Sequence, residues 1–235
     1  MLNVKGLTGE TEYQQLDLTT RPVGRPELTY VARNFSLEDS ELARVRKQLT
    51  ERGLAYMSLA PTEARVLQFL IRGFGIRRIV EIGALYGYSA LCMAKALPAD
   101  GQIISLEKDP ERCAIAVANA RASTVAAKID NRCGDALELL GQIAGPVDMV
   151  FIDADKAGYL KYLDWAEKTV HPGGLIVGDN TFLFGALWDD LRGGHGIEAW
   201  MIPIMQEFNR RLADLKRYNS ILVPTAEGMT IGQKL

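Results

Sequence analysis

The chain has few of the residues that mark zinc, redox or secreted proteins. Its 235 residues include three cysteines and two histidines, and no C-x-x-C or paired Cys/His motif occurs. The common zinc and dithiol motifs are therefore excluded. We expect Cys92, Cys113 and Cys133 to be structural free thiols, buried in a protein of the reducing cytosol.

Long apolar runs and a strong net charge are also missing. No apolar stretch approaches the ~20 residues that a membrane-spanning helix needs. The first residues lack the basic and apolar segments of a secretion signal. A formal charge of −2 gives no whole-chain reason to bind nucleic acid. We therefore expect a cytoplasmic protein without a membrane partner.

What the chain does have is ordinary globular composition, 48% hydrophobic and 24% charged, and a regular alternation of strand-like and helical segments from Arg77 onward. Helices are expected at about 88–97, 109–124, 135–143 and 156–170. The expected strands are Arg78–Ile82, Gln102–Glu107, Ile129–Cys133, Val147–Asp153 and Leu175–Asp179. Such alternation is typical of a mainly parallel sheet with helices on both faces.

The carboxyl-terminal part adds a helix near 197–213 and two further strands, Ser220–Val223 and Gly228–Ile231. Their short connection favours a hairpin and thus an antiparallel edge. The prediction is an α/β, Rossmann-like, seven-stranded and mostly parallel sheet in a single domain, residues 1–235.

The amino-terminal part is less regular. Residues 1–35 show no sustained periodicity, which indicates an arm or lid, or else a disordered tail. Ser36-x-x-Asp39 resembles a capping box and predicts a helix that ends at Gly53. A second helix is expected from Pro61 to Gly73.

A glycine-containing loop follows the first expected strand. It has the form G-x-x-x-G, from Gly83 to Gly87, and matches neither the dinucleotide-binding G-x-G-x-x-G motif nor a Walker A motif. Glu107 ends the second strand, where an acid can accept hydrogen bonds from ribose hydroxyls. A nucleoside without a pyrophosphate fits this pattern, and a purely structural turn is the alternative.

Charged and amide side chains follow the next two expected strands. The segment Val147–Lys156 ends in Asp153, Asp155 and Lys156, and Asp179-Asn180 closes the following strand. Ligands of parallel α/β sheets lie at the carboxyl ends of the strands, although a solvated strand end gives the same pattern. Two carboxylates and an amide oxygen suit Mg²⁺ or Ca²⁺, whereas Asp-Asn alone is more often a turn.

Five motifs together carry a resemblance. They are VEIGALYGYSALCMA, LEKDP, the GDA of Gly134–Ala136, FIDADK and GGLIVGDN. In this order and spacing the chain resembles the cation-dependent class I O-methyltransferases, the group that includes the caffeoyl-CoA and catechol O-methyltransferases. The match runs from about Met57 to Asn180 and continues loosely to the carboxyl terminus.

The resemblance implies that the chain binds S-adenosylmethionine. It places Glu107 at the ribose and Ala136, beside Asp135, at the adenine. The full set of implied cofactor positions is Leu59, Glu81, Gly83, Ala84, Ser89, Glu107, Asp135, Ala136, Asp153 and Asp155.

The resemblance also implies a metal-assisted reaction. Asp153, Asp179 and Asn180 match the metal ligands, with Mg²⁺ expected and Ca²⁺ or Mn²⁺ as alternatives. A phenol with a pKa near ~10 needs activation at neutral pH, and a cation can chelate two adjacent hydroxyls and stabilise the phenolate. Lys156 matches the general base, so Lys156 and Asp153 are the implied catalytic residues.

The sequence leaves several alternatives for the methyl acceptor. Leu183 stands where many relatives have a tryptophan beside the aromatic acceptor. A small catechol-like aromatic is the leading acceptor. The alternatives are a hydroxyuridine in tRNA, since some bacterial relatives modify RNA, and a non-catalytic protein that binds S-adenosylmethionine. A homodimer is expected because relatives are often dimers.

Overall fold

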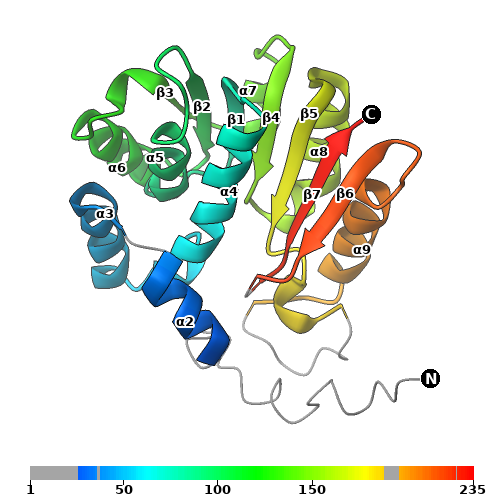
Figure 1. The fold of residues 1–235 in the computed structure, drawn as a ribbon, viewed down its shortest axis with the longest axis horizontal. Coiled ribbons are helices and arrows are strands. Elements are labelled where there is room, and N and C mark those ends of the chain that lie inside the picture. Colours follow the sequence, from blue (N-terminus) through cyan, green and yellow to red (C-terminus); the bar gives the residue numbers. More distant parts are fainter. Residues whose placement is uncertain (1–25, 36–37, 188–195, 226) are drawn as a thin grey trace.

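A seven-stranded sheet forms the centre of the molecule (Figure 1). The computed structural model describes residues 26–35, 38–187, 196–225 and 227–235. The strands are β1 (Arg78–Ile82), β2 (Gln102–Glu107), β3 (Ile129–Cys133), β4 (Val147–Ile152), β5 (Val170–Asp179), β6 (Tyr218–Val223) and β7 (Met229–Lys234). Their order in the sheet is β3-β2-β1-β4-β5-β7-β6.

The first five strands are parallel, and β7 is antiparallel to both of its neighbours, β5 and β6. The predicted Rossmann-like sheet with an antiparallel carboxyl-terminal hairpin is thus confirmed. Because β1 to β5 are parallel, their carboxyl ends lie at one edge of the sheet. Most of the predicted site residues lie at or just after these ends, whereas Leu59 precedes helix α4 (Pro61–Gly73).

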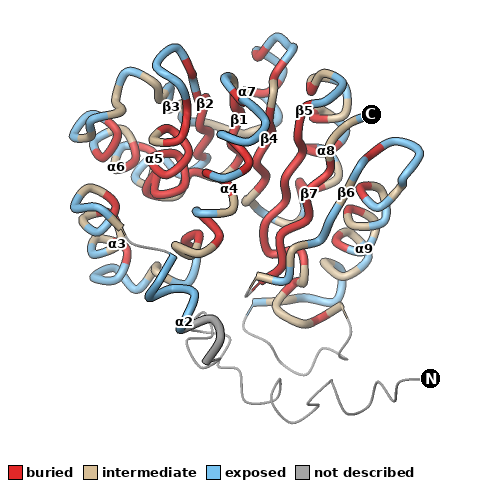
Figure 2. The backbone as a smooth tube through the Cα atoms, viewed as in Figure 1, coloured by how far each residue is buried: buried red, intermediate tan, exposed pale blue. Residues whose placement is uncertain are grey.

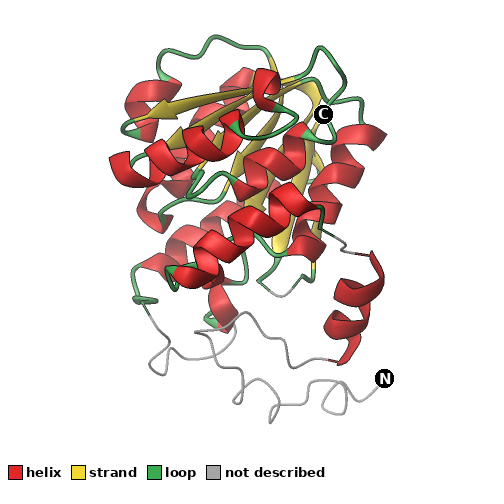
Figure 3. Cartoon of the chain, turned by 90° about the vertical axis from the view of Figure 1, so that its left-hand side faces the viewer, coloured by secondary structure: helices red, strands yellow, loops and turns green. Residues whose placement is uncertain are grey.

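Helices cover both faces of the sheet (Figure 3). They are α2 (Pro26–Phe35), α3 (Ser40–Glu51), α4 (Pro61–Gly73), α5 (Tyr88–Ala94), α6 (Pro110–Arg121), α7 (Ala136–Leu140), α8 (Tyr159–Thr169) and α9 (Met201–Leu212). Short 3₁₀ turns occur at η2 (Ala55–Met57), η3 (Ala126–Lys128), η4 (Lys156–Gly158) and η5 (Leu183–Gly185).

The central strands are largely buried (Figure 2), and their alternate residues pack in two different cores. On β4, Met149 and Phe151 pack in the core that includes α3, α4 and α5, while Val150 and Ile152 pack in the core that includes α7, α8 and α9. This is the period-two alternation of a strand buried on both faces. The central strands are therefore held rigidly from both sides, and so are the loops at their ends.

The structure adds to two predictions for the amino-terminal part. No helix was predicted within the arm, residues 1–35, but residues 26–35 form α2, which begins at Pro26, a favourable first helical residue. The residue that caps α3 is Asp39, whose carboxylate accepts hydrogen bonds from the Glu41 and Leu42 amides; Ser36 lies outside the described residues. The rest of the predicted arm, residues 1–25, lies outside the described residues.

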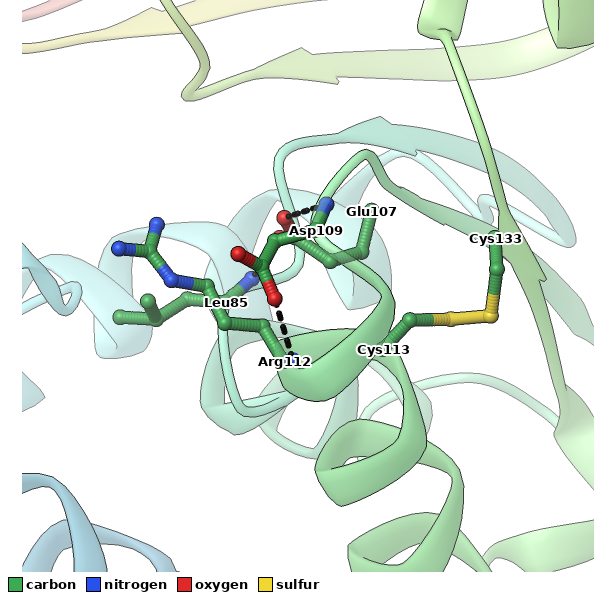
Figure 4. The surroundings of a disulfide bond; sticks show 6 residues. All are labelled: Leu85, Glu107, Asp109, Arg112, Cys113 and Cys133. Carbon is green, nitrogen blue, oxygen red and sulfur yellow. Dashed lines mark hydrogen bonds between the residues drawn. A yellow bond between two sulfur atoms is a disulfide. The ribbon is translucent and has the colours of Figure 1, made fainter.

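The prediction of three free thiols is wrong for two of them. Cys113, in the first turn of α6, and Cys133, the last residue of β3, form a disulfide with a Cα–Cα distance of 5.7 Å (Figure 4). Cys92 is free and buried, as predicted. The sequence could not pair the two cysteines because they are 20 residues apart and meet only when α6 packs beside the end of β3.

In the described part of the chain, no helix is both long and apolar enough to cross a membrane.

Candidate active site

The glycine loop after β1 is built for close backbone contact. Gly83 has φ +100°, and a Cβ there would lie 2.1 Å from the Asp153 carbonyl oxygen, so only glycine fits. The Gly83 and Ala84 amides both donate to the Leu106 carbonyl at 3.0 Å. The loop is thus wedged between the ends of β2 and β4, which brings the predicted cofactor loop against Asp153.

Glu107 is fixed at the end of β2 by two backbone amides (Figure 4). Its carboxylate accepts hydrogen bonds from Leu85 N at 2.7 Å and Asp109 N at 2.9 Å. Leu85 has φ +50°, an uncommon conformation for a bulky side chain and one that tends to occur at functional sites. A carboxylate can accept about four hydrogen bonds, so Glu107 retains capacity for donors such as ribose hydroxyls.

Glu81 is a fully buried acid on β1. Its Oε2 accepts a hydrogen bond from the Ser105 hydroxyl of the neighbouring strand. Burial raises the pKa of Glu81 to about 7; hydrogen bonds from Ser105 and Ser89 oppose the rise, and the carboxylates of Asp153 and Glu107 add to it. The structure therefore brings these predicted acids together.

The segment after β3 continues the same edge. The Gly134 amide donates to the Glu107 carbonyl at 2.9 Å. Asp135 caps α7 by accepting hydrogen bonds from the Leu137 and Glu138 amides, and Ala136 is the first residue of that helix. These contacts place Asp135 and Ala136 next to the ribose-binding candidate Glu107.

Asp155 has a structural role that the sequence did not predict. Its carboxylate accepts a hydrogen bond from Gly158 N and one from the Tyr162 hydroxyl, each at 2.9 Å. The pKa of Tyr162 is raised, chiefly by burial, then by Asp155 and by the charge of Asp135. Asp155 therefore bonds Tyr162 directly, and the charge of Asp135 acts on the same tyrosine.

The predicted metal ligands lie at the ends of two adjacent strands, β4 and β5. Ile152 of β4 pairs with Gly178 of β5, so the next residues are Asp153 and Asp179. The Asp179 side chain is fully buried, and Asn180, 9% exposed, has φ +54°. Asparagine tolerates this left-handed conformation, which turns the chain sharply at the edge of the sheet. Within the described ranges, no group of three or more His, Cys, Asp or Glu side chains could hold a metal; the predicted set has two carboxylates and an amide.

Lys156 lies at the junction of these two strand ends. Its Nζ donates a hydrogen bond of 2.7 Å to the Tyr159 hydroxyl and lies 4.1 Å from the centroid of the Tyr159 ring. The Tyr159 hydroxyl in turn donates to the carbonyls of Asp179, at 2.7 Å, and Ile152, at 3.2 Å. The structure thus brings the predicted base to the end of the strands that carry the predicted metal ligands.

Two predicted positions lie deeper than the sequence suggested. Leu59 is 2% exposed in the core that includes α4. Leu183, compared above with an acceptor-facing tryptophan, is fully buried in the other core. Its neighbours Phe182 and Phe184 are partly exposed.

The sequence missed Ser105 and Tyr159. Tyr159 follows Lys156 by three residues, which places the two side chains on one side of a helical turn, so that signal was available. Ser105 meets Glu81 only through the register of β1 and β2, which a single sequence does not contain.

Comparisons with known proteins identify the family of the chain. The O-methyltransferase family model matches residues 33–235. A catechol O-methyltransferase of Niastella koreensis is 38% identical over 165 residues, which cover 68% of this chain and 75% of that protein. Caffeoyl-CoA O-methyltransferase 2 of Zea mays is 31% identical over 209 residues, covering 86% of this chain and 79% of the relative.

Solved structures match over a similar extent. The O-methyltransferase TomG from Streptomyces achromogenes, in complex with S-adenosylmethionine, is 28% identical with a TM-score of 0.77, covering 88% of this chain and 94% of that one. The O-methyltransferase from Bacillus cereus, in complex with S-adenosylhomocysteine, is 28% identical with a TM-score of 0.76, covering 88% and 96%. The chain belongs to this family of S-adenosylmethionine-dependent O-methyltransferases.

Proposed function

We propose that this protein transfers a methyl group from S-adenosylmethionine to a hydroxyl of a small catechol-like aromatic, with the help of a divalent cation. One observation carries the proposal. The Lys156 amino group is anchored, through Tyr159, to the backbone at the ends of β4 and β5. The same two strand ends carry Asp153, Asp179 and Asn180.

The cofactor is assigned to the loops after β1, β2 and β3. Glu107 is the ribose ligand, held ready by the Leu85 and Asp109 amides. Asp135 and Ala136 contact the adenine, and Asp155 lies close by. The methionine part is assigned to Glu81, Gly83, Ala84 and Ser89, with Leu59 and Asp153 at its borders. Support comes from TomG and the Bacillus cereus enzyme, which are complexes with S-adenosylmethionine and S-adenosylhomocysteine.

The residues at the ends of β4 and β5 fit a divalent cation. Two carboxylates and an amide oxygen are hard donors of the kind that Mg²⁺ prefers, and Ca²⁺ or Mn²⁺ can use the same set. A carboxylate as buried as that of Asp179 is stabilised by a positive charge. When bound, the cation supplies Lewis-acid stabilisation of a phenolate.

Lys156 is assigned the role of general base. One N–H of Lys156 donates a hydrogen bond to the Tyr159 hydroxyl. The lone pair of the neutral amine is therefore directed away from Tyr159. The base takes the proton of the acceptor hydroxyl, the sulfonium S–CH₃ bond breaks, and the new O–CH₃ bond forms. S-Adenosylhomocysteine and a methyl ether are the products.

A catechol-like acceptor is favoured by the printed names of the relatives, which include catechol and caffeoyl-CoA O-methyltransferases. Membership of the family speaks against a non-catalytic binding protein, and the comparisons do not favour tRNA. We still predict a homodimer and a cytoplasmic location, as we expected from the sequence.

The direct test is an acceptor screen with methyl-labelled S-adenosylmethionine. Catechol, caffeoyl-CoA and hypomodified tRNA are each incubated with the full chain in Mg²⁺, in EDTA, and in EDTA followed by excess Mg²⁺. We expect label in a diol, loss of labelling in EDTA, and recovery with Mg²⁺. Labelling that survives complete chelation would overturn the cation requirement, and labelling of tRNA alone would overturn the acceptor.

A further inference from the structure

We infer that Tyr159 is a positioning residue, whose hydroxyl fixes the Lys156 amino group over the ends of β4 and β5. The inference rests on the proposed function, because it concerns the residue that acts as base. Tyr159 is the first residue of α8 and is fully buried.

The hydrogen bonds at the Tyr159 hydroxyl have a fixed polarity. The carbonyl oxygens of Asp179 and Ile152 can only accept, so the single hydroxyl proton of Tyr159 is directed to them. The remaining lone pairs can only accept, and Lys156 Nζ is the donor 2.7 Å away. The chain of hydrogen bonds therefore runs from the lysine, through the tyrosine, to the two strand ends.

The tyrosine ring is itself immobilised. It packs edge-on against Phe208 of α9, with ring centroids 5.2 Å apart and an interplanar angle of 65°. The Phe208 ring is in turn seated on Gly178 of β5, where a Cβ would lie 2.5 Å from Phe208 Cε1. The hydroxyl is thus fixed from the strand side and from the helix side.

Lysine needs such an anchor because it has a flexible four-carbon side chain with considerable rotamer entropy. A displacement of about 1 Å at a reacting group can cost about 100-fold in rate. Tyr159 does not itself reach an acceptor, because its side chain is buried and its proton is engaged by backbone. It acts through Lys156.

The first test compares Tyr159→Phe with Tyr218→Phe, a matched control. Tyr218 is also buried, at 1% exposure, and its hydroxyl bonds to Glu167, outside the site. Assays use the full chain with S-adenosylmethionine, Mg²⁺ and catechol. Tyr159→Phe should lower kcat by about 10- to 100-fold, while the KM for catechol and the calorimetric Kd of S-adenosylmethionine stay unchanged. Tyr218→Phe should leave kcat unchanged. Equal kcat in Tyr159→Phe and the wild type would overturn the inference.

A double-mutant cycle separates positioning from general weakening of the fold. Lys156→Ala should lower kcat by about 100- to 10,000-fold without changing S-adenosylmethionine affinity. If Tyr159 acts through Lys156, the variant with both substitutions is no slower than Lys156→Ala. Multiplied losses would mean a structural role and would overturn the inference. Full activity of Lys156→Ala would instead overturn the assignment of the base in the proposed function.

A third test measures the accessibility of the Lys156 amino group and does not depend on turnover. Limited acylation of surface amines, read by peptide mass spectrometry, gives the labelling rate of Lys156 relative to the exposed Lys161 of α8. Loss of the tyrosine hydroxyl should raise this ratio in Tyr159→Phe and leave it unchanged in Tyr218→Phe. An unchanged ratio in Tyr159→Phe would show that the hydroxyl does not hold the amine.

Discussion

Glu81 is a buried acid whose ionised form is destabilised by its surroundings in the candidate site. Its side chain is fully buried on β1, and burial, together with the nearby charges of Asp153 and Glu107, raises its pKa to about 7. Above that pH the cofactor-free protein carries an ionised carboxylate in its interior. A positively charged cofactor group next to Glu81 would relieve this cost.

Replacing Glu81 by glutamine should therefore change how stability depends on pH. The pKa of Glu81 is raised in the folded state from 4.5 to about 7, so its contribution to stability is complete below pH 4.5 and is lost as the pH rises to 7. The loss is about 3 kcal/mol. Raising the pH from 4.5 to 8 should therefore change the difference in free energy of unfolding between Glu81→Gln and the wild type by about 3 kcal/mol, in favour of Glu81→Gln.

Urea unfolding in EDTA, without cofactor, measures this difference. Glu111→Gln, which changes an exposed acid of α6, is the control and should show no such gain. If the difference between wild type and Glu81→Gln is the same at both pH values, the raised pKa of Glu81 is wrong.

At the scale of elements, the disulfide ties together the two segments assigned to the nucleoside. Cys113 belongs to α6, which follows Glu107, and Cys133 directly precedes the Gly134–Ala136 segment (Figure 4). The hydrogen bond from Gly134 N to the Glu107 carbonyl joins the same segments. The cross-link therefore stabilises one side of the candidate cofactor site.

Reduction of this disulfide should lower the free energy of unfolding. For a loop closed over 20 residues, chain entropy predicts a loss of about 3 kcal/mol. Urea unfolding with and without dithiothreitol measures the loss, and the Cys113→Ser/Cys133→Ser variant, which has no bond to reduce, is the control. Identical unfolding curves for the oxidised and reduced wild type would show that the cross-link does not stabilise the fold.

The same scale shows what the sequence could predict. Strands and most helices were predictable, because apolar periodicity and residues such as Pro110 are local signals. Helix α2 was missed, since one short helix beginning at a proline resembles a break. The contacts Glu81 to Ser105 and Cys113 to Cys133 were not predictable, because they depend on how segments far apart in the chain align. The acids at the ends of β2, β4 and β5, and Lys156, were predictable because the carboxyl ends of parallel strands meet at one edge of the sheet.

At the scale of the whole molecule, the edge of the sheet has two halves. The loops after β1, β2 and β3 form the candidate cofactor half, and the ends of β4 and β5 form the candidate cation half. They meet where Gly83 packs against the Asp153 backbone. A methyl donor in one half and an activated oxygen in the other would then face each other across this contact, as methyl transfer requires.

The most direct test of this arrangement is the position of the cation. Crystals grown with S-adenosylhomocysteine and Mn²⁺ are measured at the manganese absorption edge. We predict one anomalous peak within coordination distance of the side-chain oxygens of Asp153, Asp179 and Asn180, and its loss in Asp179→Ala. No peak at these three residues, or a peak that persists in Asp179→Ala, would contradict the proposed site.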